Sequence, residues 1–171
     1  MDFFVSVTAP PHRGELRCGE RVFSCAVGRG GIRKNKHEGD GVTPEGCFAI
    51  REIFFRPDRV QEPDSKIPTR ALTPADGWCD DPADRAYNRL VRLPYPARAE
   101  KLWREDGQYD VIAVLGYNDA PVESGRGSAI FLHVAKPDMT ATEGCVALAL
   151  DDLLAVLKLA GTDARLCASA D

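Results

Sequence analysis

A cysteine and a histidine in the C-terminal third of the chain have the types and surroundings that nucleophilic catalysis requires. Cys145 ends the segment Thr142-Glu143-Gly144-Cys145, and eleven residues separate it from His133. A free thiol with a pKa of about 8.5 is mostly protonated at neutral pH, so an imidazole that takes its proton increases the nucleophilic fraction. We therefore predict Cys145 as the attacking thiolate and His133 as its base, provided the intervening loop doubles back.

The residues before Cys145 suit the stabilisation of a negatively charged intermediate. Gly144 allows a tight backbone turn, so the amides of Glu143, Gly144 and Cys145 could converge on a developing oxyanion. This arrangement needs no third catalytic side chain.

Alternation along two expected strands places both candidates on faces opposite to aliphatic residues. In 128–134, Ile130, Leu132 and Val134 share one face, and Ala129, Phe131 and His133 share the other. In 145–150, Cys145 shares its face with Ala147 and Ala149, which leaves room for an acyl group. The ordinary alternatives are a structural histidine and an inert buried thiol.

Short β-prone runs separated by turn residues predict a strand meander in the N-terminal third. The expected strands there cover 3–8, 16–18, 21–27 and 47–55, with Gly19-Glu20 as a hairpin tip. Two further strands, 109–117 and 128–134, are expected to be neighbours. The chain should end with a helix that has Asp151 as its N-cap and stops at Gly161, followed by a strand at 165–168.

Residues 57–96 contain seven of the twelve prolines, so regular sheet is not expected there. We interpret about 57–108 as an irregular excursion from one catalytic domain that spans 1–171, with a short helix at 97–105. A connection of this length is usually functional.

Composition describes a globular protein and excludes several classes. With 171 residues, 44% hydrophobic residues and a net charge of −4, the chain fits one domain and does not resemble a sequence-independent nucleic-acid binder. No apolar run is long enough to span a membrane. The six cysteines and three histidines lack metal-ligand spacing, so we expect no metal or other cofactor, and we interpret the five cysteines other than Cys145 as small buried hydrophobes.

Three other features allow weaker alternatives. The basic cluster from Arg29 to Lys36 is ordinarily a solvated turn, although it could meet an anionic group of a substrate. His37 could replace His133 as the base. The glycines at 28–31 lack the spacing of a nucleotide-binding loop.

Together these motifs resemble the L,D-transpeptidase catalytic domain of the YkuD type. Thr142-Glu143-Gly144-Cys145 and the preceding His133 match the family signature, and Thr43-Pro44-Glu45-Gly46-Cys47-Phe48 resembles its Thr-Pro-x-Gly-x-Phe segment. The resemblance covers nearly the whole chain. It implies a mainly β fold of packed mixed β-sheets, a sandwich or barrel, with one or two short helices.

The resemblance also implies a reaction and a site. Cys145 would attack a peptidoglycan stem peptide at the carbonyl between the L-centre of a diamino acid and a D-residue, form a thioester, and pass the acyl group to an amine. His133 would take the thiol proton and be oriented by a backbone carbonyl, Thr142 would support the loop, and Tyr117 would line the cleft. A hydrolase (L,D-carboxypeptidase or amidase) with the same site and a catalytically silent binding module are the alternatives.

The sequence departs from the family pattern at two positions. Val134 follows the histidine where the family usually has Gly, and Ala147 stands where an Arg usually follows the cysteine. Arg126, Lys136 or the Arg29–Lys36 cluster could replace that Arg. The resemblance implies the cell envelope or periplasm, whereas residues 1–7 lack the features of a signal peptide, which predicts a cytoplasmic protein if the chain is complete.

Overall fold

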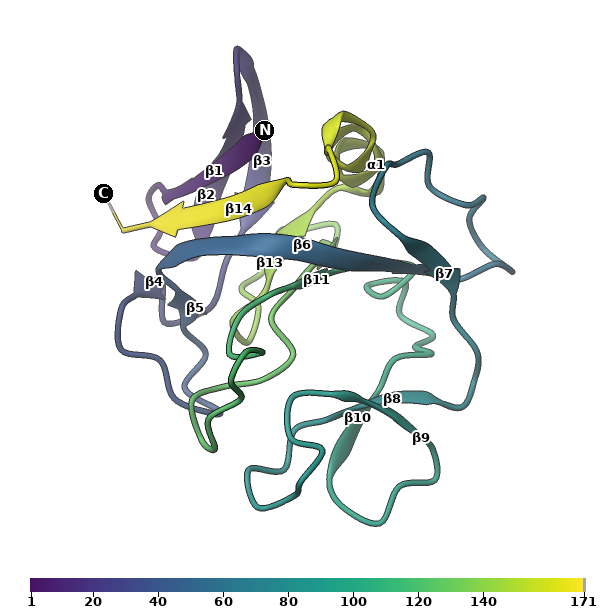
Figure 1. Ribbon diagram of the computed structural model, residues 1–171. Helices are drawn as coiled ribbons and strands as arrows, with labels where there is room; N and C mark the ends of the chain where they lie inside the picture. The colour runs from purple at the N-terminus through teal and green to yellow at the C-terminus, as the bar shows by residue number, and fades with distance from the viewer. Residues whose placement is uncertain (171) are drawn as a thin grey trace.

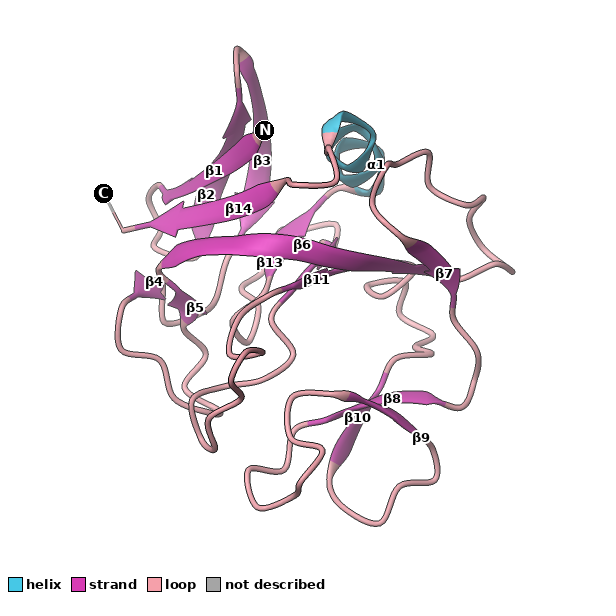
Figure 2. Cartoon of the chain, in the orientation of Figure 1, coloured by secondary structure: helices cyan, strands magenta, loops and turns pink. Residues whose placement is uncertain are grey.

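The strands form a closed, barrel-like sheet with one helix packed against it (Figures 1 and 2), as the computed structural model describes for residues 1–170. The elements are β1 (Asp2–Val7), β2 (Arg13–Cys18), β3 (Arg21–Ala26), β4 (Ile32–Arg33), β5 (Thr43–Pro44), β6 (Gly46–Phe55), β7 (Thr69–Ala71), β8 (Asp76–Cys79), β9 (Leu90–Arg92), β10 (Ala99–Lys101), β11 (Val111–Leu115), β12 (Phe131–Val134), β13 (Val146–Leu148), α1 (Leu150–Leu159) and β14 (Arg165–Ser169). The prediction of a mainly β fold is confirmed.

The long strand β6 closes the main sheet. The sheet order is β11-β12-β13-β3-β2-β1-β14-β6-β7, and β6 also pairs with β11. The first part of β6 pairs with β14, and its second part pairs with β11 on one side and β7 on the other. The predicted neighbours 109–117 and 128–134 supply β11 and β12, which are neighbours as expected and pair antiparallel.

Hydrophobic residues pack on both sides of the strands nearest Cys145. Ile130 and Leu132 belong to the main core inside the barrel, which α1 helps to cover through Leu153, Val156 and Leu157. Phe131 and Cys145 belong to a second cluster on the outer face of the sheet. The predicted alternation is therefore confirmed, and β11 is buried along its whole length because it separates the two clusters.

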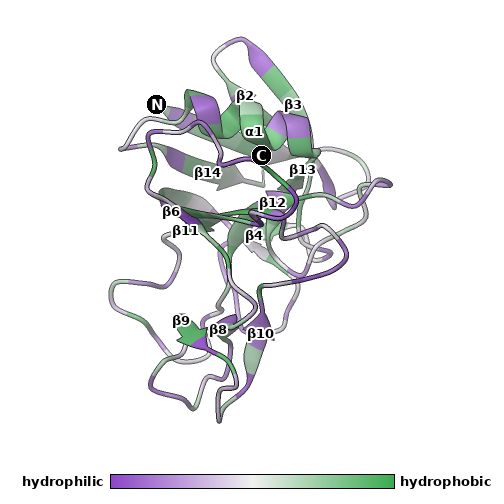
Figure 3. Cartoon of the chain, turned by 90° about the vertical axis from the view of Figure 1, so that its right-hand side faces the viewer, coloured by the Kyte–Doolittle hydropathy of each residue, from purple (hydrophilic) through white to green (hydrophobic). Residues whose placement is uncertain are grey.

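A small three-stranded sheet, β10-β8-β9, covers this outer face; we call it the cover sheet. It lies apart from the barrel strands in Figure 1 and below them in Figure 3. Trp78 of β8 packs edge-on against Phe131 of β12, with ring centroids 5.1 Å apart. The expectation of no regular sheet in 57–96 is wrong, and so is the helix at 97–105, where β10 pairs antiparallel with β8.

The N-cap of the C-terminal helix lies two residues earlier than predicted. Ala149 occupies the N-cap position and makes no side-chain capping bond, so Asp151 lies in the first turn, where its charge favours the positive end of the helix dipole. The helix ends at Leu159, just before Gly161.

Cys47 of β6 and Cys167 of β14 form a disulfide across the paired strands. The interpretation of these two cysteines as buried free thiols is wrong, whereas Cys18, Cys25 and Cys79 are free and buried. Within residues 1–170, no helix has the length and apolar character that a membrane span requires.

Candidate active site

Cys145 lies immediately before β13, at the point where this strand meets β12. Its Sγ donates a hydrogen bond to the Ala129 carbonyl at 3.2 Å and accepts one from the Phe131 amide at 3.4 Å. Ala129 has a φ of +54°, a left-handed conformation that is uncommon for alanine, and its amide donates to Asn88 Oδ1 at 3.0 Å. The backbone before β12 therefore holds the thiol.

The buried surroundings keep this thiol protonated. The pKa of Cys145 is raised to about 12, mainly by burial and also by the Glu100 carboxylate, although the Phe131 amide, Lys36 and Arg104 favour the thiolate and act to lower the pKa. The hydrogen bond to the Ala129 carbonyl agrees with a protonated thiol, because a carbonyl can only accept. Attack on a carbonyl carbon therefore requires a base that takes the proton.

His133 is buried on β12 and held by the backbone carbonyl of its neighbour. Its Nδ1 lies 2.9 Å from the Val134 oxygen, in agreement with the orientation that the family resemblance implies. Since that oxygen only accepts, Nδ1 carries the proton of the neutral ring and Nε2 keeps a lone pair. Burial lowers the pKa of His133 to about 4, so the imidazole is neutral at pH 7 and able to accept a proton.

The fold brings His133 and Cys145 to the same face of the sheet. β12 and β13 pair in parallel, with His133 opposite Ala147, so Cys145 lies one same-face position before the partner of His133. The Tyr109 ring packs against both His133 and Phe131, with centroids 5.3 Å and 5.9 Å apart. Among residues 1–170, the hydrogen bonds of Sγ involve Ala129 and Phe131, and His133 is not one of its partners.

The segment before Cys145 is fixed by two threonine hydroxyls. Thr142 Oγ1 accepts from the Gly144 amide at 3.1 Å and donates to the Cys145 carbonyl at 2.6 Å. Thr43, from the segment that resembles the second family motif, donates to the same carbonyl at 3.4 Å. The Gly144 amide already has a partner here, so an oxyanion role for it would require Thr142 to release it.

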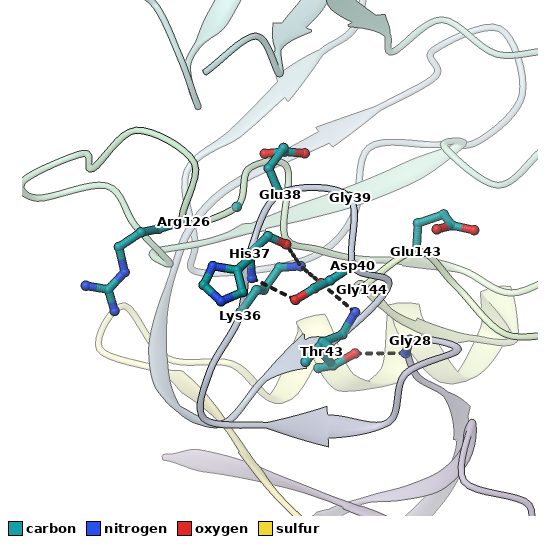
Figure 4. A network of polar contacts seen from close by, with 12 residues as sticks. Gly28, Lys36, His37, Glu38, Gly39, Asp40, Thr43, Arg126, Glu143 and Gly144 are labelled. Atoms are coloured by element: carbon teal, nitrogen blue, oxygen red, sulfur yellow. Dashed lines mark hydrogen bonds and ion pairs between the residues drawn. The ribbon is translucent and has the colours of Figure 1, made fainter. Parts of the chain in front are cut away.

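Gly144 occupies a position that no larger residue fits. Its φ is +137°, and a Cβ there would lie 2.8 Å from the Val42 carbonyl oxygen. Glu143 points outward and pairs with Arg29 Nε at 3.1 Å. Figure 4 shows Glu143 and Gly144 near the loop 36–43.

Cys145 opens into a cavity of about 360 Å³. The residues that line it come from the loop 36–39, the residue after β8, strand β10, and the segments before β11, β12 and β13: Lys36, Glu38, Gly39, Asp80, Glu100, Tyr109, Ser128, Ala129, Glu143 and Cys145. These residues include four acidic residues and one lysine. Such a lining suits a substrate group that carries a positive charge.

The three predicted substrate-binding residues lie elsewhere. Tyr117 and Arg126 line a separate cavity of about 280 Å³, where the Tyr117 hydroxyl donates to the Arg126 carbonyl. Arg126 also pairs with Glu123 at 2.9 Å. Lys136 is exposed in the loop after β12 and lines neither cavity. The structure does not bring these residues to Cys145.

The basic cluster contains one residue that is not solvated. Lys34 is 81% exposed, whereas the Lys36 side chain is only 3% exposed and pairs with Asp40 at 2.8 Å. The interpretation of a solvated turn is therefore wrong for Lys36. His37, the alternative base, has an exposed side chain and does not line the cavity.

Two residues beside Cys145 escaped the sequence reasoning. Tyr109 Oη donates to Glu100 Oε1 at 2.5 Å, and both side chains line the cavity. Burial raises the pKa of the Glu100 carboxyl. Glu100 lies in β10, a strand of three residues, and no motif in the sequence marks it. Only the fold of the cover sheet brings it to the site.

The described residues 1–170 contain no group of three His, Cys, Asp or Glu side chains that could hold a metal ion. A comparison with curated proteins gives no match. The L,D-transpeptidase catalytic domain family (YkuD) matches residues 9–165, nearly the whole chain. The chain therefore belongs to the L,D-transpeptidase catalytic domain family.

Proposed function

We propose that this protein transfers acyl groups between peptidoglycan stem peptides through a thioester on Cys145. The observation that carries the proposal is the position of the thiol. Cys145 lies directly before β13 and lines a cavity of about 360 Å³. It shares a sheet face with the buried, neutral imidazole of His133. Membership of the family supplies the reaction class.

The residues suggest the following first half-reaction. His133 Nε2 takes the proton of Sγ as the sulfur attacks the scissile carbonyl, which forms the C–S bond and an oxyanion. Collapse of this intermediate breaks the C–N bond, and the imidazolium gives its proton to the departing amine. Backbone amides around Glu143 and Cys145 are the candidate donors to the oxyanion.

The second half-reaction returns the enzyme to its starting state. An acceptor amine attacks the thioester, the new C–N bond forms, and the C–S bond breaks. The proton lost by the amine passes through His133 to the departing sulfur. The carboxylates of Glu38, Asp80, Glu100 and Glu143 support an amine over water as acceptor, because an ammonium group is attracted to an acidic cavity.

Whether the acyl-enzyme reacts with an amine or with water tests the choice of acceptor. A tetrapeptide with a D-residue at its end is mixed with the protein, and products are measured by mass spectrometry with and without an added diamino acid peptide. We expect the cross-linked product to exceed the hydrolysed tripeptide when the amine is present. Hydrolysis that is unaffected by amine would instead assign a carboxypeptidase, and no turnover of either kind would favour a binding module.

We also propose that the protein works in the cell envelope. Its family is usually associated with that compartment. The Cys47–Cys167 disulfide supports the same location, since disulfides persist in oxidising compartments and are rare in the cytosol. Alkylation of free thiols in cell fractions, followed by peptide mapping, would find these two cysteines blocked in the envelope fraction. Free Cys47 and Cys167 in native material would contradict this location.

A further inference from the structure

The Lys36 side chain is buried and packs closely against backbone at two glycines. A Cβ on Gly127 would lie 2.8 Å from Lys36 Cε, and a Cβ on Gly144 would lie 3.4 Å from Lys36 Nζ. Both glycines have φ values in the range that favours glycine, +108° and +137°. The lysine stem therefore fills the space that Gly127 leaves before β12, and its ammonium end lies beside Gly144, directly before Cys145.

Two contacts fix the ammonium group of Lys36. Nζ donates to Asp40 Oδ1 at 2.8 Å and lies 3.4 Å from the His37 carbonyl oxygen. Asp40 also accepts from the amides of His37 and Val42, at 2.7 Å and 2.9 Å, so the pair closes the loop 37–42. Figure 4 shows Lys36 and Asp40 at the centre of these contacts, with Gly144 close by.

We propose that Lys36 is a positioning residue for the nucleophile, whose buried ammonium, held by Asp40 beside Gly144, stabilises the Cys145 thiolate as it forms. The proposal rests on the proposed function in one respect, the assignment of Cys145 as the nucleophile. Burying a lysine costs free energy unless its charge is paired, and here the Asp40 carboxylate supplies the pair.

The acidic residues around the thiol give such a cation an electrostatic role. Glu38, Asp80, Glu100 and Glu143 line the cavity and oppose a negative sulfur. Arg98 pairs with Asp80 at 3.0 Å and Arg29 with Glu143 at 3.1 Å, which reduces the effect of two of these carboxylates. Tyr109 and the neutral His133 add no charge. Lys36 and Arg104 are the two cations that favour the thiolate of Cys145, and Lys36 lines the cavity itself.

The chain lacks the arginine that the family pattern usually has near the cysteine. The usual Arg after the cysteine is replaced by Ala147, which is buried on β13. Among the cations that could compensate, Arg126 and Lys136 lie away from the cavity, and Lys36 lies in it. A cation from a distant segment thus faces the nucleophile.

Alkylation of Cys145 by iodoacetamide measures this effect without any peptide substrate. The thiolate attacks the methylene carbon, the S–C bond forms and iodide leaves, so the rate at fixed pH follows the thiolate fraction. Rates are measured from pH 6 to 10 by mass mapping of the Cys145 peptide. Each variant is used only when circular dichroism shows the native β spectrum.

Two substitutions separate charge from loop closure. Lys36→Met keeps the length and removes the charge, and we expect the rate to fall about tenfold at each pH. Asp40→Asn removes the opposing charge and keeps one acceptor for the Val42 amide, so the rate should rise. A purely structural pair would shift both rates in the same direction, because both substitutions break the same contact.

Two further variants complete the test. Lys36→Arg should stay within about threefold of the unmodified protein because the charge is retained. Lys34→Met removes an exposed charge from the same segment and should leave the rate unchanged.

If Lys36→Met does not fold, the direction of the rate change in Asp40→Asn still tests the proposal. An unchanged rate in Lys36→Met, or a fall in Asp40→Asn, would overturn the proposal. Failure of acyl transfer with these thiol rates intact would instead overturn the proposed function.

Discussion

The thiol of Cys145 and the imidazole of His133 are both neutral in this protein, and burial is the cause of each. The pKa of the thiol is raised to about 12 and that of the imidazole is lowered to about 4. A resting ion pair is therefore disfavoured. In the proposed mechanism, the thiolate would form together with proton transfer to His133 as substrate approaches.

Removal of His133 tests its role as base. With His133→Ala, we expect the rate of acylation of Cys145 by a stem peptide to fall at least about 100-fold at pH 7, because general-base catalysis contributes about 10²–10⁴. Stopped reactions analysed by intact mass give the rate. His37→Ala is the matched control, since His37 is exposed and does not line the cavity. Equal losses in both variants would count against the assignment.

The pH dependence of the same reaction follows from the lowered pKa of His133. The ring stays unprotonated until the pH falls to about 4, whereas an ordinary histidine becomes protonated near 6.5. Acylation should therefore keep its rate from pH 7 to about 5 and be lost as the pH falls through about 4. Half-loss near pH 6.5 would show an ordinary, exposed imidazole and contradict this picture.

At the scale of elements, the cover sheet completes the site that β12 and β13 begin. Asn88, after β8, accepts from the Trp78 indole at 3.0 Å and the Ala129 amide at 3.0 Å, and donates to the carbonyls of Tyr117 and Asn118. This one side chain joins the cover sheet to the backbone that holds Cys145. Its φ of +58° is also one that asparagine tolerates better than most residues.

Substitution of Asn88 should loosen the cover sheet. Asn88→Gly accepts the same backbone conformation but removes all four hydrogen bonds, so we expect the free energy of unfolding to fall by about 1–3 kcal/mol. Hydrogen exchange should increase at 76–101 and 129–131 more than in β1 or β2. Asn118→Gly is a control at another left-handed asparagine. Unchanged exchange at 129–131 in Asn88→Gly would refute the link to Cys145.

Sequence patterns predicted the barrel strands better than the cover sheet, for physical reasons. The period-two alternation in 128–134 reports burial on two faces and located both Phe131 and His133 correctly. β8, β9 and β10 contain only three or four residues each, too few for a visible period, and they depend on pairing over long sequence distances. The burial of Lys36 was equally hidden, because Gly127 and Gly144 are far away in sequence.

At the scale of the whole molecule, strand β6 closes the barrel and a disulfide cross-links it. Cys47 and Cys167 are 120 residues apart in sequence and join β6 to β14. The cross-link therefore connects the strand that closes the sheet with the last strand of the chain. Neither cysteine lines the Cys145 cavity.

Loss of this disulfide should lower stability and spare the chemistry. In Cys47→Ser/Cys167→Ser we expect the free energy of unfolding to fall by roughly 2–5 kcal/mol, because the unfolded chain regains freedom over a long loop. Urea titration followed by fluorescence measures this change. The alkylation rate of Cys145 at pH 8 should stay the same in the folded variant. A loss of reactivity without a loss of stability would contradict the separation of the two sites.

The central claim is that Cys145 carries the acyl group, and trapping the acyl-enzyme tests it most directly. A stem tetrapeptide is mixed with the protein, quenched in acid after a short time, and digested for peptide mass mapping. We expect the donor tripeptide acyl mass, with loss of the terminal D-residue, on the peptide that contains Cys145, and no adduct in Cys145→Ser. An adduct on Cys18, Cys25 or Cys79, or turnover that survives in Cys145→Ser, would contradict the account.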